Sequence, residues 1–206
     1  MAESYRTTTW ACYLSYVVQS VVNTLPPLLF VTFQQSYGLT VAQLGLLVVL
    51  NFGSQVVIDL LAAPIADHYG YRATMLFGHG CALGGLVLMA LLPQLVGFWG
   101  ILVAMVFNAL GGGIVEVLVS PIVEAIPDEK AKSGALAMLF GFYSWGTVLT
   151  VVGTTVLFSV LGAARWYWIS LCWIFLSMCC IALFLHCPIA PLIKEGETGL
   201  SGRALA

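Results

Sequence analysis

Charged side chains are scarce in this sequence. Asp, Glu, Lys and Arg make up 8% of its 206 residues, whereas soluble globular domains carry about 25%. Hydrophobic residues account for 61% of the chain. So few charges cannot coat the water-facing surface of a protein of this size. The composition therefore excludes a soluble globular domain and indicates an integral membrane protein.

Several other functional signatures are also missing. The net charge is −2, and no basic cluster indicates a nucleic-acid partner. The six cysteines lie in or beside apolar segments without the spacing of a metal site, and we interpret them as packing residues. No serine or cysteine has a histidine and an acid nearby in sequence. The sequence therefore predicts no metal, no cofactor, no nucleic-acid partner and no enzyme activity.

The apolar residues form six blocks that are long enough to cross a bilayer as helices. A transmembrane helix needs roughly 20 apolar residues, and hydrocarbon admits only helices and closed barrels. The blocks have helix length. We therefore predict an all-α bundle of six transmembrane helices over residues 1–193, followed by a polar cytoplasmic tail or linker at residues 194–206. The predicted spans are residues 10–33, 41–66, 73–92, 98–126, 133–161 and 166–187.

The Lys and Arg residues predict the orientation, because cytoplasmic loops of membrane proteins are enriched in them. Only Arg165 lies on one side of the predicted bundle. Both termini are therefore predicted to be cytoplasmic, in a multi-pass protein of the cell inner (plasma) membrane. The basic residues on the other, cytoplasmic side are Arg6, Arg72, Lys130, Lys132, Lys194 and Arg203.

Two acids lie well inside the predicted spans, and no Lys or Arg is available at mid-membrane to pair with them. These acids are Asp59 and Glu116. Ionisable groups at such depth are costly and are candidates for function by default. Burial favours the neutral form of a carboxyl group, so both are predicted proton-coupling residues. The alternative is that a neutral acid simply ties helices together.

Polar and aromatic residues inside the spans predict a binding cavity. Asn51, Gln55 and Asp59 are spaced i, i+4 and i+8, which places them on one helix face. The lack of a mid-membrane cation argues against an anionic substrate and favours a neutral or cationic one. Amide groups and aromatic faces together suit a sugar ring. The predicted substrate-binding residues are Gln19, Asn23, Asn51, Gln55, Asn108, Tyr143 and Trp145.

The alternative for the aromatic residues is that they pack against neighbouring helices or lipid. For Phe140 and Phe142 we favour that alternative. For Tyr143 and Trp145 the two interpretations are balanced.

The segment between the second and third spans carries a recognisable motif. Residues 63–72 read APIADHYGYR, which resembles the signature G-x-L-A-D-R-x-G-R-K of the major facilitator superfamily. Asp67, Gly70 and Arg72 match, whereas Ala63 and Tyr71 are among the residues that depart from it. The resemblance implies that these three residues belong to a cytoplasmic gate, with the acid held against a helix of a second half. From the residues alone, Asp67 could pair with Arg72 or with a helix N-terminus, or the motif could be a plain capped turn.

The fourth span strengthens the resemblance. Residues 111–116 read GGGIVE, and Ser120-Pro121 follows. This pattern resembles the fucose-permease branch of the superfamily, whose fourth helix carries G-x-G-x-x-E with a glutamate that accepts the coupling proton. The resemblance assigns that role to Glu116. The branch also has an aspartate in its first helix, which has no counterpart here, so a second proton site is absent or has moved to Asp59.

The resemblance implies the N-terminal six-helix half of a secondary transporter that couples a small, neutral, sugar-like solute to protons. A complete transporter of this kind has two six-helix halves with the substrate site between them. The implied partners are the lipid bilayer, the small-molecule substrate, protons and a second six-helix half. That half could be a second copy, a separate chain or the remainder of a longer protein. The alternative is a non-transporting membrane protein or truncated remnant that acts by helix–helix interaction.

Overall fold

The computed structural model describes residues 5–127 and 129–190, with the backbone alone for residues 129–133. The predicted tail at residues 194–206, with Lys194 and Arg203, lies outside the described residues. The side chains of Lys130 and Lys132 lie outside them as well. Every regular element in the described part of the chain is helical.

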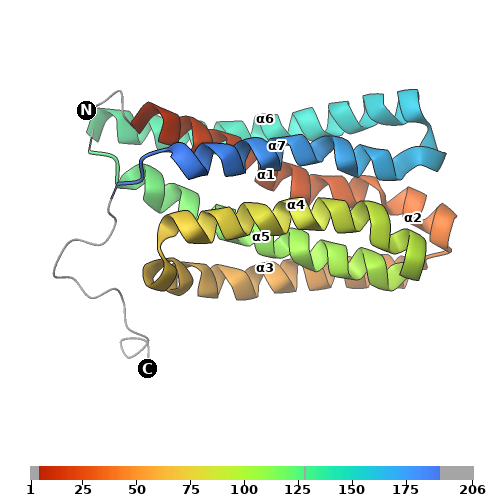
Figure 1. Ribbon diagram of the computed structural model, residues 1–206. Coiled ribbons are helices and arrows are strands. Elements are labelled where there is room, and N and C mark those ends of the chain that lie inside the picture. The colour runs from red at the N-terminus through yellow and green to blue at the C-terminus, as the bar shows by residue number, and fades with distance from the viewer. Residues whose placement is uncertain (1–4, 128, 191–206) are drawn as a thin grey trace.

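The helices run alternately up and down one bundle, so that α1 begins and α7 ends at the same end (Figure 1). Five helices are long and apolar enough to cross a membrane, and α1 with α2 forms a sixth span if this bent pair is counted as one. The structure therefore agrees with the predicted all-α membrane bundle. The helices are α1 (Arg6–Leu28), α2 (Phe30–Tyr37), α3 (Val41–Tyr69), α4 (Tyr71–Val96), α5 (Phe98–Glu124), α6 (Glu129–Leu161) and α7 (Trp166–His186), with a 3-10 turn, η2, at Ala163–Arg165.

The first span is bent, where the sequence prediction had one continuous helix over residues 10–33. The chain breaks at Leu29, and the axes of α1 and α2 differ by 43°. The cause is the pair Pro26-Pro27 just before the break. Proline has no backbone N–H and its ring crowds the preceding turn, so two consecutive helical hydrogen bonds are lost. The N–H of Leu29 instead bonds the Pro26 carbonyl at 3.0 Å.

Helix α3 has a distinct capping residue at each of its ends. Gly70 alone lies between α3 and α4, with φ at +90°, a conformation that residues with a Cβ rarely adopt. At the other end, Thr40 caps α3 by accepting from the N–H of Gln43, and the Gln43 side chain accepts from the N–H of Thr40. The helices thus extend beyond the predicted span limits at residues 66 and 73.

Helix α5 lies at the centre of the bundle, and three consecutive glycines allow it to contact a different neighbour on each side. A Cβ atom at Gly111 would lie 2.6 Å from the backbone nitrogen of Ala82 in α4. A Cβ at Gly112 would lie 3.3 Å from the Val22 side chain in α1, and Gly113 faces α3. At Gly111 only glycine permits the approach, because a Cβ would meet backbone atoms, whereas at Gly112 and Gly113 the neighbouring atoms belong to side chains.

The buried apolar side chains form two clusters, stacked along the bundle, and polar residues lie at the level where one gives way to the other. On α3 the change falls between Leu47 and Ile58, and on α5 it falls between Met105 and Ile114. Gln55 of α3 lies inside this interval. A polar layer within an apolar bundle requires partners for its side chains, and this layer holds the candidate site.

Candidate functional site

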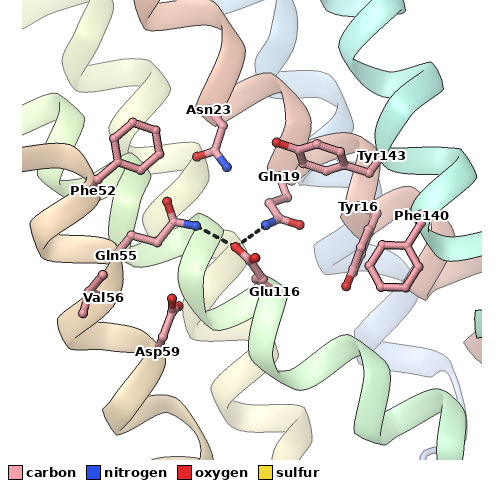
Figure 2. Close-up of a pocket in the computed structure, with 10 residues that line it drawn as sticks. All are labelled: Tyr16, Gln19, Asn23, Phe52, Gln55, Val56, Asp59, Glu116, Phe140 and Tyr143. Atoms are coloured by element: carbon pink, nitrogen blue, oxygen red, sulfur yellow. Dashed lines mark hydrogen bonds between the residues drawn. The ribbon is translucent and has the colours of Figure 1, made fainter. Parts of the chain in front are cut away.

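A cavity of about 440 Å³ opens beside α5 at the polar level. Four helices line it: α1, α3, α5 and α6 (Figure 2). The volume is in the range of small-molecule sites, which measure about 300–1,000 Å³. The lining residues are Tyr16, Gln19, Asn23, Phe52, Gln55, Val56, Asp59, Glu116, Phe140 and Tyr143.

Glu116 of α5 is held by two amide groups from two other helices. The Nε2 of Gln19 in α1 donates to Oε2 of Glu116 at 2.7 Å, and the Nε2 of Gln55 in α3 donates to the same oxygen at 2.6 Å. Figure 2 shows the two amides approaching the carboxyl group from opposite sides. Hydrogen bonds to an ionised carboxyl group are short and strong. The arrangement can therefore hold a negative charge in the bundle without a cation.

Asp59 lies one turn after Gln55 on α3 and faces the same cavity. Its Oδ1 atom is shielded from solvent and has no hydrogen-bond partner among the described residues. Two carboxyl groups therefore share one cavity, and only Glu116 has donors arranged around it. Asp59 has unused capacity to accept a hydrogen bond from a bound molecule.

Aromatic rings form the opposite side of the cavity. Tyr16 of α1 lies between Phe140 and Tyr143 of α6, with ring centroids 6.1 and 6.3 Å apart and nearly perpendicular planes. Figure 2 places these rings across the cavity from Asp59. Edge-to-face contacts of this kind keep aromatic side chains in place. A bound molecule would thus meet amide and carboxyl groups on one side and ring faces on the other.

Three predicted binding residues lie away from the cavity. Asn51 shares the face of Gln55 but is 6% exposed and does not reach the lining. Asn108 is fully buried beside Gly85 of α4, and both of its side-chain polar atoms lack a partner among the described residues. Trp145 is 74% exposed, because a residue two positions after Tyr143 lies on the opposite side of a helix.

Four lining residues were not among the predicted binding residues: Tyr16, Phe52, Val56 and Phe140. Helical spacing could have found the first, since Tyr16 precedes Gln19 by three positions. Phe140 likewise precedes Tyr143 by three, although we favoured packing for it; it is 64% exposed at the edge of the cavity. The other two residues differ in no visible way from the remaining apolar side chains of α3.

Arg72 makes a contact that the sequence motif does not indicate. Its guanidinium donates three hydrogen bonds, at 2.7 to 2.9 Å, to backbone carbonyls at the C-terminal end of α7. The last carbonyls of a helix have no partner inside the helix and carry partial negative charge. Arg72 thereby joins the start of α4 to the end of α7. The three acceptors are the carbonyls of Phe184, Leu185 and Cys187.

Asp67 therefore does not pair with Arg72, one of the two partners considered from sequence. Its Oδ1 accepts a hydrogen bond of 3.2 Å from the hydroxyl of Tyr71, one turn later in the chain. Gly70 makes the turn between them. Nothing else among the described residues bonds the Asp67 carboxyl, so this group is available to a further partner.

In the described part of the chain, no group of three or more His, Cys, Asp or Glu side chains is placed so that it could bind a metal ion. His79 is fully buried, and its Nε2 lies 3.0 Å from the hydroxyl oxygen of Ser15 in α1. The imidazole ring therefore serves as a link between α4 and α1.

Comparison with known proteins identifies a family. The model of the Major Facilitator Superfamily matches residues 12–203. The uncharacterized MFS-type transporter YvkA of Bacillus subtilis is 24% identical and is matched over 92% of this chain. That match covers 42% of YvkA.

Two solved structures share the fold. The fucose:proton symporter FucP of E. coli superimposes with a TM-score of 0.72 at 19% identity, over 91% of this chain and 50% of FucP. A D-xylose-proton symporter superimposes with a TM-score of 0.75 at 12% identity, over 91% of this chain and 49% of that protein. The chain thus spans about half the length of the relatives that it matches.

Proposed function

The chain belongs to the Major Facilitator Superfamily, a family of transporters and not of enzymes, and we propose that it forms one six-helix half of a proton-coupled secondary transporter. The solute is small, neutral and sugar-like. Glu116 carries the coupling proton, and Asp59 is a second acid of the same cavity. The two structural relatives are themselves described as sugar:proton symporters, which agrees with this class of activity.

One observation carries the proposal: Glu116 accepts hydrogen bonds from two amide groups inside a cavity of the membrane bundle. Its carboxyl group has no cationic partner among the described residues, so its charge is supported by dipoles alone. Such a group can gain and lose a proton as its access to water changes. An acid that served only to tie helices together would not need to face an open cavity.

The chemistry of the cavity wall supports a sugar-like solute. Amide and carboxyl groups of Gln19, Asn23, Gln55 and Asp59 can bond to hydroxyl groups, and the ring of Tyr143 can cover an apolar CH face. No Lys, Arg or His belongs to the lining. An anionic solute would therefore lack a counter-charge.

The cavity opens at the surface of the bundle beside exposed side chains, and we propose that a second six-helix half completes it. The outward face of α3 presents apolar side chains beside the cavity, among them Phe52 at 58% exposure and Val56 at 59%. Such a face suits either lipid or another helix. The second half would be another copy of this chain, a separate chain or further sequence of the same protein.

We further propose that the end of the bundle where α1 begins and α7 ends faces the cytoplasm, in the plasma membrane. Arg6 and Arg72 lie at that end, and Arg165 follows α6 at the other (Figure 1). This distribution follows the rule that basic residues remain on the cytoplasmic side. Asp67, Gly70 and Arg72 would then form part of a cytoplasmic gate, with the free capacity of Asp67 directed to the second half.

Uptake into proteoliposomes tests the proposed function. We would offer radiolabelled fucose, xylose, galactose and glucose, with and without an inward proton gradient. The unmodified protein should accumulate at least one sugar only with the gradient, and Glu116→Gln should abolish accumulation while equilibrium exchange of the same sugar continues. Glu124→Gln provides a matched control, because Glu124 lies exposed at the end of the same helix.

Gradient-driven accumulation by Glu116→Gln would refute the proton role. If folded protein transported none of the sugars, alone or with a co-expressed second half, the solute class would be wrong. Loss of folding in the Glu116→Gln variant would favour the alternative of an acid that ties helices together.

A further inference from the structure

We propose that Gln19 and Gln55 are the coupling element of this site: they detect the charge on Glu116 by reversing their amide groups, and so convert proton binding into a change in the hydrogen-bonding character of the cavity. The inference deepens the proposed function, on which its link to transport rests. The amide reversal itself is a property of the folded chain and can be tested without any substrate.

Both donors converge on one oxygen of Glu116. The amide nitrogens of Gln19 and Gln55 lie 2.7 and 2.6 Å from Oε2 of Glu116. A carboxylate is an acceptor only, so it requires N–H groups from both glutamines. The observed geometry fits the ionised state, in which both amides direct an N–H group at the carboxylate.

The oxygen atom of each amide lies in a different environment from its nitrogen. The Oε1 atoms of Gln19 and Gln55 are shielded from solvent and have no hydrogen-bond partner among the described residues. Two buried acceptors without donors are unfavourable. The ionised state of Glu116 thus satisfies two N–H groups and leaves two amide oxygens unsatisfied.

Protonation of Glu116 changes which hydrogen bonds its carboxyl group can make. When a proton from water in the cavity binds Glu116, the charge of the carboxyl group changes from −1 to zero, and one of its oxygens becomes an O–H donor. Hydrogen bonds to the remaining oxygen lose the charge assistance that makes them about twice as strong as neutral ones. An amide that turns by half a revolution then offers its free Oε1 to the new O–H group. That turn moves an N–H₂ group to the position that Oε1 had occupied.

The surrounding ionisable groups do not supply a competing partner. The titratable side chains that face Glu116 across the cavity are Tyr16 of α1, Asp59 of α3 and Tyr143 of α6. None of them is a cation, and α4 packs on the other side of α5 without lining the cavity. The two glutamines are therefore the groups that respond directly to the charge of Glu116.

The consequence for transport is a change in what the cavity presents to a solute. With Glu116 ionised, one N–H of each amide is bonded to the carboxylate. With Glu116 protonated, at least one amide directs its N–H₂ group away from the carboxyl group, and a solute whose binding opens the shielded Oε1 position can accept from it. Proton and solute then bind more favourably together than singly, which is the requirement for symport.

Infrared difference spectroscopy tests the inference on the complete chain in lipid. The protein would be made with glutamine carrying carbon-13 in the side-chain amide, and spectra at acid and alkaline pH would be subtracted. We expect isotope-shifted amide carbonyl bands in the difference spectrum. The bands should vanish in Glu116→Gln and fall to roughly half in Gln19→Leu and in Gln55→Leu, because each variant removes one of the two responding amides.

Gln94 provides the matched control. Its amide donates to the Ala90 carbonyl at 2.6 Å within α4, away from the cavity, so Gln94→Leu should leave the bands unchanged. Unmodified protein without isotope-shifted bands would overturn the inference, and so would bands that persist in Glu116→Gln. Bands that behave as expected in a protein that transports no sugar would support the coupling element while refuting the proposed substrate.

Discussion

The two sides of α5 differ in how closely the neighbouring helices pack against them. Toward α4 the helix presents Gly111, whose Cα lies so close to α4 that a Cβ would meet the backbone of Gly78 and Ala82 at 2.8 and 2.6 Å. Toward α1 and α3 the same helix presents Glu116, which faces an open cavity. One side is closed by backbone contact, with the buried Asn108 side chain beside Gly85 of α4, and the other side borders empty space.

The contrast indicates that rigid packing and the candidate site lie on different sides of the same helix. Backbone contact between α4 and α5 leaves no room for adjustment, since protein interiors resist small changes in volume. The proposed response of Gln19 and Gln55 involves reversal of their side-chain amide groups alone and requires no movement of a helix. Helix α5 thus forms part of the closely packed frame on one side and of the cavity wall on the other.

The largest effect is expected on the closed side. In Gly111→Leu the new side chain would meet backbone atoms of α4, which cannot move away as a flexible side chain could. Overpacking typically lowers the free energy of unfolding by about 1–3 kcal/mol, and occasionally by more. For Gly111→Leu we expect a loss of about 3 kcal/mol or more. Gly80→Leu is the control, because a Cβ there meets nothing within 4 Å. Folded yield and thermal unfolding in detergent would measure both.

A Gly111→Leu variant as stable as the Gly80→Leu variant would break the comparison. It would mean that α4 and α5 can separate at small cost.

The next effect is expected where Arg72 joins α4 to α7. Arg72→Ala removes three hydrogen bonds from a charged donor to the end of α7. Bonds of this kind contribute about 1.5–3 kcal/mol each when buried, and partial exposure reduces that sum to about 3 kcal/mol in total. Thermal unfolding of Arg72→Ala and Arg72→Lys would measure the loss, with Lys expected to retain part of it because it has a charge but no planar fork.

Arg165→Ala serves as the control, because Arg165 is exposed at the opposite end of the bundle. If Arg72→Ala had the stability of this control and impaired only transport, Arg72 would act in the gate alone.

A smaller effect is expected from substitutions of Gly112 and Gly113, which face α1 and α3. A Cβ at Gly113 would lie 2.2 Å from Cγ2 of Ile58 and 2.9 Å from Oδ1 of Asp59, whereas a Cβ at Gly112 would come no nearer than 3.3 Å, to the Val22 side chain. Gly113→Ala should therefore preserve folding but displace α3, and reduce gradient-driven uptake by roughly tenfold, which corresponds to about 1.4 kcal/mol. Gly112→Ala should reduce it by less. Equal uptake by the two variants would show that the spacing of α3 does not matter to the site.

The fold was largely predictable from sequence because hydrocarbon leaves so few alternatives. Six apolar blocks must be helices to satisfy their backbone groups, and the observed helices follow those blocks. The bend at Leu29 was missed, although its cause, Pro26-Pro27, is visible in the sequence. Tandem prolines show where a helix is weak, but the packing of α2 against its neighbours decides how far it bends.

The candidate site was predictable only in part. Glu116, Asp59 and Gln55 stand out because polar groups inside a span are costly, and the structure brings them to one cavity. Asn108 carries the same signal, yet it turns toward α4, because the side of a helix that meets the cavity depends on neighbours that the sequence does not reveal. For Tyr16 the one available signal was its position three residues before Gln19, since an aromatic ring in an apolar helix is otherwise unremarkable until its surroundings are known.

The smallest effect is expected at Trp145, and it sharpens the comparison by separating two aromatic residues of α6. Tyr143 lines the cavity and contacts Tyr16, whereas Trp145 is 74% exposed on the far side of the helix. Tyr143→Ala should therefore lower the affinity for a transported sugar several-fold, because a ring that covers a solute is lost. Trp145→Ala should change uptake by less than about twofold, since surface substitutions usually alter free energies by no more than about 0.5 kcal/mol. Uptake measured over a range of sugar concentrations would distinguish them. A strong effect of Trp145→Ala would place a functional contact on the outer face of α6, where a second six-helix half would have to supply the other side.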